Sequence, residues 1–381
     1  MKRSICWVTG SNFFNVDDSV VSMLKTEFSI KWYILIQKDK NVNILWIKNR
    51  LKELNVSAEL VYLNRFRSVK NIFLYFNMIQ QIKKINPDLL YLDALGLPYL
   101  FPMLLFSQIE SDKLIYACHD FVEHVNIPHR RLIKFYKKII FHRAKHFKFF
   151  SLSQQRLFQK VFPEKHSFYT YLTSQSYGAA SNVIKSKDKV VFLFFGAIRE
   201  NKGLEILIEA VNMLPQSLKG QYVVRICGYT SKWDYYMDRI NDVDNFELNI
   251  KYVQNKDVAN VFQSSDYLVL PYRDVSQSGP LSISYNYNVP VIASDHDGFR
   301  EFINNGINGF LFKNADANSL KGVLQKIIEG KVDYGAIKFS QQKFVEDNLN
   351  TGVIAEKYAQ AFKNIITLIP QHYSLTLFIS A

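Results

Sequence analysis

The sequence predicts an α/β protein with two doubly wound, mostly parallel sheets. Apolar runs of four to seven residues alternate with segments of helical periodicity along the chain, as in successive βαβ units. The length of 381 residues favours two domains over one. A stretch rich in Ser, Gly, Ala and Lys, residues 173–189, separates two blocks of such runs and is typical of a linker.

The first block predicts an N-terminal domain over residues 1–175. Its expected strands are residues 5–8, 32–36, 89–92, 113–118 and 147–152. The turn Gly10-Ser11-Asn12 follows the first strand. Because ligands of open parallel sheets bind beyond the carboxyl ends of the strands, this turn is a candidate for ligand contact.

The second block is more regular and predicts a C-terminal domain over residues 185–338. Its expected strands are residues 190–195, 222–227, 247–253, 267–270, 290–293 and 309–312, with helices between them, for example at 203–213 and 316–328. Six strands in this length indicate one doubly wound domain. Residues 339–381 follow as a third segment, with a helical pattern over 339–366 and a short apolar tail.

The composition excludes several classes of protein. Hydrophobic residues make up 48% and charged residues 21%, which excludes intrinsic disorder and fibrous repeats. The three cysteines lie far apart in apolar runs, so we expect buried thiols in a reducing compartment and no zinc site or disulfide framework. No apolar run approaches the ~20 residues that span a bilayer. We therefore expect a cytoplasmic protein.

The positive charge is concentrated in the N-terminal half. Up to residue 180 there are 26 basic and 13 acidic residues, against 21 of each afterwards. Residues 124–163 contain no acidic residue, and basic residues from Arg130 to Lys148 alternate with apolar ones at helical spacing, which predicts a basic amphipathic helix. Its lipid-facing or acceptor-facing candidates are Arg130, Arg131, Lys134, Lys137 and Lys138. The helix is either an ordinary solvated face or a surface attracted to an anionic membrane. No nucleic-acid recognition motif accompanies it, so lipid is favoured over nucleic acid.

Two turns after strands of the second block are the strongest candidates for binding chemistry. The first, residues 195–203, places Arg199 and Lys202 beside a glycine turn that leads into a helix, and two such cations can neutralise a diphosphate without a metal. The second, residues 271–280, offers Ser278 as an N-cap and Gly279 beside it. A solvated basic turn and an ordinary N-cap are the simpler alternatives for these two turns.

The second block resembles the donor domain of the retaining, family 4 (group 1) glycosyltransferases of the GT-B fold, bacterial surface-polysaccharide type. The resemblance rests on the order and spacing of FLFFGAIRENKGLEILIEAV, VVRICGY, YVQNKDVANVFQSSDYLVLPYRD and SQSGPLSISYNYNVPVIASDHDGFREFINNGINGFLF, over residues 190–330. The first half is similar more loosely, in PDLLYLDALG and IYACHDFVEH. The resemblance implies two Rossmann-like domains facing a central cleft, with the last helix returning toward the N-terminal domain.

The same resemblance assigns site residues. It implies that Arg199 and Lys202 clamp the diphosphate and, together with His119, form the catalytic set. It implies a donor-binding set comprising, besides Arg199 and Lys202, Gly10, Ser11, Asp274, Gln277, Ser278, Gly279, Ser282 and Glu301.

The sequence departs from the family pattern at two places. Ala197 follows the first glycine where arginine is common, and Arg199 stands two places later. The pair of glutamates seven residues apart that usually handles the donor sugar and ribose would fall at Val275 and Ile283, neither of which can hydrogen-bond through its side chain. Asp274, Gln277 or Ser282 would then take the hydroxyl contacts.

The resemblance implies transfer of a sugar, with retention, from a nucleoside diphosphate sugar to a saccharide or lipid-linked saccharide in polysaccharide or lipopolysaccharide biosynthesis. We expect no cofactor, no metal and no nucleic-acid partner, and peripheral association with the anionic inner leaflet. The alternatives are a GT-B sugar-nucleotide epimerase and a catalytically silent nucleotide-binding scaffold. The presence of both Arg199 and Lys202 argues against the scaffold, because a catalytically silent domain needs no diphosphate clamp.

Overall fold

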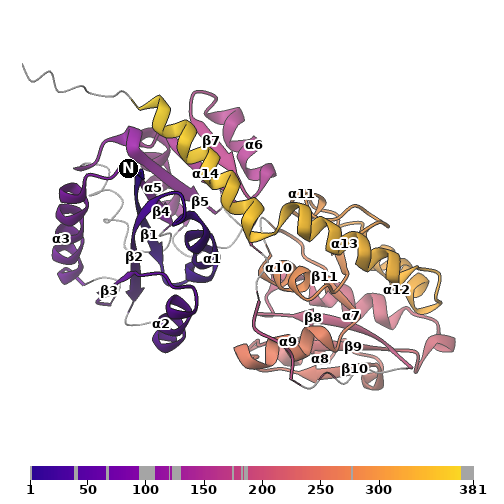
Figure 1. Cartoon of the computed structure of the whole chain (residues 1–381). Coiled ribbons are helices and arrows are strands. Elements are labelled where there is room, and N and C mark those ends of the chain that lie inside the picture. Colours follow the sequence, from indigo (N-terminus) through magenta and orange to yellow (C-terminus); the bar gives the residue numbers. More distant parts are fainter. Residues whose placement is uncertain are drawn as a thin grey trace, which may run out of the picture. The chain divides into compact units, whose positions relative to one another are not determined.

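The computed structural model describes residues 2–37, 42–65, 68–93, 108–119, 121, 130–173, 176–181, 183, 188–275 and 278–369, the side chains of 130–133 and 136 excepted. The chain forms two compact units (Figure 1). Unit 1 comprises Met1–Phe149, Gln155–Thr170 and Ile354–Ala381, and unit 2 comprises Phe150–Gln154 and Tyr171–Val353. The segment expected at 339–381 is thus divided, because α13 (Tyr334–Asn348) belongs to unit 2 and most of α14 (Thr351–Leu368) to unit 1.

Unit 1 is built on a parallel sheet of seven strands in the order β3-β2-β1-β4-β5-β6-β7. The strands are β1 (Ser4–Gly10), β2 (Ser29–Gln37), β3 (Glu59–Leu63), β4 (Leu89–Asp93), β5 (Leu114–Cys118), β6 (His146–Phe149) and β7 (His166–Tyr169). Its described α-helices are α1 (Phe14–Leu24), α2 (Ile44–Glu53), α3 (Lys70–Ile85), α5 (Arg130–Arg143) and α6 (Leu152–Val161), besides α14. The sequence predicted five of these strands and missed β3 and β7. Both lie at sheet edges and are largely half-buried. β7 has no apolar run that would mark it, whereas β3 contains the short run 60–63, which the sequence prediction overlooked.

The C-terminal helix α14 completes the core of unit 1 (Figure 1). Phe362 is fully buried, and its ring centroid lies 6.0 Å from that of Trp7 and 5.9 Å from that of Phe28. The Tyr358 and Tyr91 hydroxyls, also buried, lie 3.1 Å apart and share a hydrogen bond. Aromatic packing and one satisfied polar pair therefore hold α14 on the first sheet.

Unit 2 is built on a parallel sheet of six strands, the number that the sequence predicted, and their order is β10-β9-β8-β11-β12-β13. The strands are β8 (Val190–Phe195), β9 (Tyr222–Cys227), β10 (Phe246–Asn249), β11 (Tyr267–Leu270), β12 (Val291–Ser294) and β13 (Gly309–Phe312). Its α-helices are α7 (Leu204–Asn212), α8 (Trp233–Met237), α9 (Asn255–Gln263), α10 (Gly279–Asn286), α11 (Asp297–Arg300), α12 (Ala317–Ile328) and α13.

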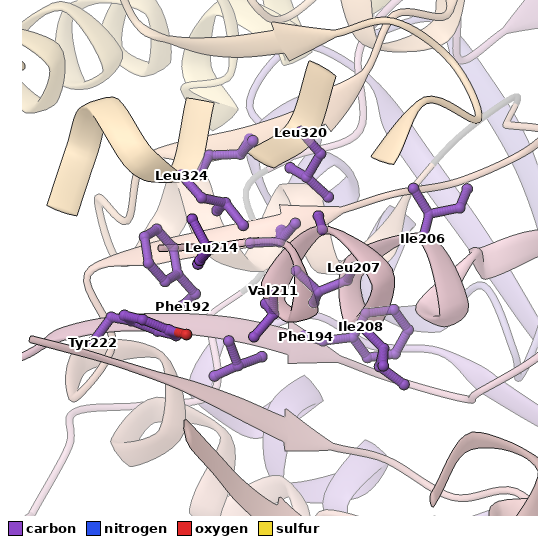
Figure 2. Close-up of a cluster of buried hydrophobic side chains, with 14 of the residues drawn as sticks. Phe192, Phe194, Ile206, Leu207, Ile208, Val211, Leu214, Tyr222, Leu320 and Leu324 are labelled. Atoms are coloured by element: carbon purple, nitrogen blue, oxygen red, sulfur yellow. The ribbon is translucent and has the colours of Figure 1, made fainter. Parts of the chain in front are cut away.

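The core of unit 2 includes a layer between the central strands and α7 and α12. Figure 2 shows Leu207 and Val211 of α7 beside Phe192 of β8, with Leu320 and Leu324 of α12 against the same layer. All five side chains are buried. Each buried large side chain contributes roughly 1.5–3 kcal/mol, and this layer fixes the start of α7, where the first candidate turn ends.

Two expectations from the composition can be compared with the structure. All three cysteines are buried and none forms a disulfide, as predicted. Burial raises the pKa of the Cys6 thiol to about 12 and that of Cys227 to about 11, which keeps both thiols protonated. Within the described ranges, every helix is too short or too polar to cross a membrane.

The substitution Phe362→Ala tests the role of α14 in unit 1. We expect a loss of about 3–5 kcal/mol in the free energy of unfolding, because a buried ring leaves a cavity. Urea unfolding followed by tryptophan fluorescence measures it, since Trp7 packs against this ring. The exposed neighbour Gln360→Ala is the control and should change stability by less than about 0.5 kcal/mol. Equal effects of the two substitutions would contradict the packing role.

Candidate functional site

The two candidate turns of unit 2 form one site because their backbones touch. Gly203 closes the first turn with φ +62°, and a Cβ atom there would lie 2.0 Å from the carbonyl oxygen of Pro271 in the second turn. The Arg273 amide also donates to the Asn201 carbonyl at 2.9 Å. Only glycine permits this approach, so residues 195–203 and 271–280, which come from neighbouring strands, are locked together.

A third strand end joins the first turn. The amide of Gly196, at φ +111°, donates to the Cys227 carbonyl at 2.9 Å. A Cβ on Gly228, the residue after β9, would lie 1.9 Å from the Gly196 carbonyl oxygen. The sequence analysis did not select Gly228, although a glycine directly after a buried strand is the available signal. These contacts present backbone at the carboxyl edge of the sheet, where ligands of such folds bind.

Lys202 lies on an aromatic ring of the second turn. Its Nζ is 3.6 Å from the centroid of the buried Tyr272 ring, a cation–π contact. Burial, together with the nearby Arg199 guanidinium, lowers the pKa of Lys202 to about 8. Arg199 itself is exposed. The charge of Arg199 thus acts on Lys202, and the diphosphate role of the two residues stays a prediction.

Tyr272 connects most of the site, and sequence reasoning missed it. The Ser278 hydroxyl donates to the Tyr272 hydroxyl at 3.4 Å. The Tyr272 carbonyl accepts from the Ser294 hydroxyl at 2.6 Å and lies 3.0 Å from His296 Nε2. Burial raises the pKa of Tyr272 to about 12, so its ring stays neutral under Lys202. One side chain therefore supports both the clamp lysine and the N-cap of α10.

The start of α10 matches the prediction in part. Ser278 is buried and caps the helix by accepting from the Leu281 amide at 3.4 Å, while Gly279 is exposed with open space around its Cα. Ser282 is buried in the first turn of the helix, and Asp274 is half-buried in the loop. Gln277 lies outside the described residues. The donor-binding roles of these residues stay predictions.

Glu301 is engaged by the start of another helix of the chain. Both of its carboxylate oxygens accept hydrogen bonds from residues 151–153: from the Ser151 hydroxyl at 2.8 Å, the Leu152 amide at 2.8 Å and the Ser153 amide at 2.6 Å. Leu152 begins α6, and a carboxylate at a helix N-terminus is electrostatically favourable. The structure therefore gives Glu301 a capping contact that the sequence did not indicate, and its donor role stays a prediction.

The two positions that lack the usual glutamates are packed with apolar neighbours. Ile283 is 4% exposed in the core between the sheet and α10, and the half-buried Val275 packs against the same core. Both side chains serve packing, so neither can contact a sugar hydroxyl.

In unit 1, His119 follows β5 and lies beside the turn after β1. Its Nε2 is 2.7 Å from Asp93 Oδ1, at the end of β4, and its ring stacks on Phe13 with centroids 4.0 Å apart. Phe13 closes the turn that holds Gly10 and Ser11, since its amide donates to the Gly10 carbonyl. The structure thus brings together the predicted residues of unit 1 and adds Asp93 and Phe13.

One of the lysines predicted to lie on the exposed face of the basic helix α5 is buried instead. Lys134 and Lys138 are exposed, and Phe135 beside them is 62% exposed. Lys137 is buried at 6% exposure, because its position on the helix faces the protein, so it does not belong to the exposed patch. The side chains of Arg130 and Arg131 lie outside the described part of the structure.

Comparison with known proteins relates this geometry to a family. Residues 180–343 match the family model of the glycosyl transferases group 1. The chain is 24% identical over 188 residues to an uncharacterized glycosyltransferase, MJ1069, of Methanocaldococcus jannaschii, covering 48% of this chain and 47% of that protein. It is 25% identical over 177 residues to the amylovoran biosynthesis glycosyltransferase AmsK of Erwinia amylovora, covering 44% of this chain and 43% of that protein. The matches thus span about half the length of these curated relatives.

A solved structure extends the likeness to both units. HepE of Anabaena, in complex with UDP-glucose, is 14% identical with a TM-score of 0.69, and the alignment covers 95% of this chain and 99% of that one. A likeness at this identity concerns the fold. The chain therefore has the GT-B fold of two Rossmann-like domains, and its second unit carries a domain that matches the glycosyl transferases group 1 family.

Proposed function

We propose that this chain is a retaining glycosyltransferase that moves a sugar from a nucleoside diphosphate sugar to a hydroxyl of a saccharide or lipid-linked saccharide. The observation that carries the proposal is the Lys202–Tyr272 contact beside Arg199, at the joined turns of a domain that matches the group 1 family. The name of AmsK, a relative in amylovoran biosynthesis, supports a place in bacterial polysaccharide or lipopolysaccharide assembly.

The clamp suits the chemistry of the leaving group. Glycosyl transfer builds negative charge on the departing diphosphate, and fixed positive charge at that position stabilises the transition state. Arg199 and Lys202 supply this charge, and the N-terminus of α10 after Ser278 adds directed amides. We propose that these groups serve without a metal ion.

Retention requires the acceptor to approach from the face that the diphosphate leaves. The bond from the anomeric carbon to the phosphate oxygen breaks, the bond to the acceptor oxygen forms, and the acceptor proton passes to the departing phosphate. In this proposal His119 positions groups near the reacting carbon. HepE, whose structure contains UDP-glucose, makes a UDP-sugar the first donor to test.

Nucleotide binding and sugar transfer test the proposal together. We expect calorimetry to detect UDP or GDP binding to the wild type, and the double substitution Arg199→Ala, Lys202→Ala to weaken it by at least about 100-fold, since each charge-assisted contact contributes roughly 1.5–3 kcal/mol. Lys326→Ala, which removes an exposed lysine of α12, is the control and should bind as the wild type does. Transfer is measured with radiolabelled UDP- and GDP-sugars and lipid-linked saccharides. A wild type that binds no nucleotide and transfers no sugar would disprove the proposal.

The lowered pKa of Lys202 gives the binding a pH dependence. Only the charged amine attracts the diphosphate, and its pKa near 8 means that the free protein loses this charge as the pH rises from 7 to 9. We expect the Kd of UDP or GDP to rise about tenfold over that interval, because binding must then take up a proton.

The substitution Lys202→Arg is the matched control for this pH dependence. Arginine stays charged throughout the interval, so the Kd of the variant should change less than about twofold. A wild-type Kd that does not vary with pH, or an equal slope in both proteins, would show that Lys202 does not bind the diphosphate as its charged form.

We further propose that α5 attaches unit 1 to the anionic inner leaflet, where a lipid-linked acceptor would be held. The exposed Lys134 and Lys138 flank the exposed Phe135, which combines charge with a ring that can enter the headgroup region. The excess positive charge of the N-terminal half favours the same surface.

Vesicle flotation tests this attachment. The double substitution Lys134→Gln, Lys138→Gln should weaken binding to vesicles of anionic lipid about thirtyfold, at roughly 1 kcal/mol for each lysine. The pair Lys48→Gln, Lys52→Gln removes two exposed lysines of α2 and serves as the control. The proposed role of α5 is wrong if the two double variants lose the same affinity for anionic vesicles. It is also wrong if the wild type does not bind anionic vesicles at moderate salt.

A further inference from the structure

The carboxylate of Asp93 holds His119 by one nitrogen. Asp93 is fully buried at the end of β4, and its Oδ1 lies 2.7 Å from His119 Nε2 at the end of β5. We assign Nε2 as the donor of this hydrogen bond, since a carboxylate oxygen accepts. The stacked ring of Phe13, at an interplanar angle of 17°, limits rotation of the imidazole out of its plane. The two contacts together hold the position of the ring.

Asp93 is costly to keep in this place. Among the described residues its second oxygen, Oδ2, accepts no hydrogen bond. A buried acceptor without a hydrogen bond costs roughly 1–3 kcal/mol. An apolar residue at this strand end would avoid that cost, so the carboxylate is more easily explained by what it does for His119 than by the stability of the sheet.

Other charged and polar groups face Asp93 from the surrounding elements. They are Asp17 of α1, Lys148 of β6, Tyr91 of β4 and Tyr358 of α14. Burial and repulsion from Asp93 raise the pKa of Asp17 well above its usual range, so Asp17 favours its neutral form. Burial lowers the pKa of Lys148 well below its usual range, while attraction to Asp93 and Asp17 opposes that shift.

Asp17 makes different contacts from Asp93. Its Oδ2 accepts from the Trp7 indole at 2.8 Å and from the Thr9 hydroxyl at 2.6 Å. These partners are core residues of β1. The buried carboxyl of Asp17 therefore connects α1 to the core, whereas the buried carboxyl of Asp93 holds His119 at the end of β5.

We propose that Asp93 is the positioning residue of His119, whose ring it holds through Nε2. The inference rests on the proposed function, in which His119 lies near the reacting carbon. Asp93 itself touches no substrate. Misplacement of a group near the reacting atoms by about 1 Å can cost roughly 100-fold in rate, so loss of this contact should lower kcat rather than donor binding.

The test combines kinetics with the ring proton of His119. In the ligand-free full chain, labelled with ¹⁵N in its histidine rings, the His119 Nε2–H should give a cross-peak protected from solvent, assigned by its loss in His119→Gln. Asp93→Ala should abolish this cross-peak and lower kcat about 100-fold. The Kd of UDP or GDP should change less than twofold, because the clamp lies in unit 2. Asp93→Asn, which keeps an acceptor oxygen of similar shape, should restore part of the kcat.

Asp17→Asn is the control for burial alone. It replaces an equally buried carboxyl and should lower the melting temperature, yet it should keep the His119 cross-peak. The proposal is overturned if Asp93→Ala retains the cross-peak, or if it retains the wild-type kcat. If Asp93→Ala does not fold, Asp93→Asn is compared with Asp17→Asn, and equal kcat values for the two would overturn it. Failure of the proposed function can be distinguished from failure of this proposal. If the wild type has no transfer activity, the His119 cross-peak of the ligand-free chain still reports whether Asp93 holds the ring.

Discussion

The contact between Gly203 and the Pro271 carbonyl is the constraint on which the site in unit 2 depends. A side chain at Gly203 would collide with backbone that cannot yield, so the turns after β8 and β11 could not close together. Their closure places Lys202 over Tyr272, and Tyr272 in turn holds Ser278 at the start of α10. The chemistry of the site therefore follows from how closely two backbones approach, and the side chains are arranged around that approach.

The sequence predicted most of the fold because buried parallel strands leave a strong pattern. The structure contains all six strands predicted for unit 2, and its buried central strands are mainly apolar runs, whereas β10 has only two apolar residues in four. In unit 1 the edge strands β3 and β7 were missed, since β7 has no apolar run and the short run 60–63 of β3 was overlooked. The pattern thus identified every central strand of both sheets, and of the four edge strands it identified β10 and β13 and missed β3 and β7.

The site was predictable only where its signal is local. The turns that contain Arg199, Lys202 and Ser278 directly follow apolar runs that predict strands, so the sequence alone locates them. Tyr272 and Asp93 gave no such signal, because an aromatic or acidic residue at a strand end has several ordinary explanations. Their roles depend on partners 70 and 26 positions away. Lys137 was misplaced for a related reason, since helical periodicity alone does not say which lysine of a basic stripe faces the core.

The contacts of Lys202 are compatible with the diphosphate-binding role that we propose for it. Arg273, in the neighbouring turn, pairs with Glu205 at 2.8 Å, and an incoming phosphate would have to displace that carboxylate. Within the described ranges Lys202 forms no ion pair and rests on the Tyr272 ring instead. A ring stabilises the ammonium without neutralising it, and it can remain in contact when a diphosphate arrives. The lowered pKa is the consequence of this arrangement, since the positive charge is kept without a compensating negative one until the ligand supplies it.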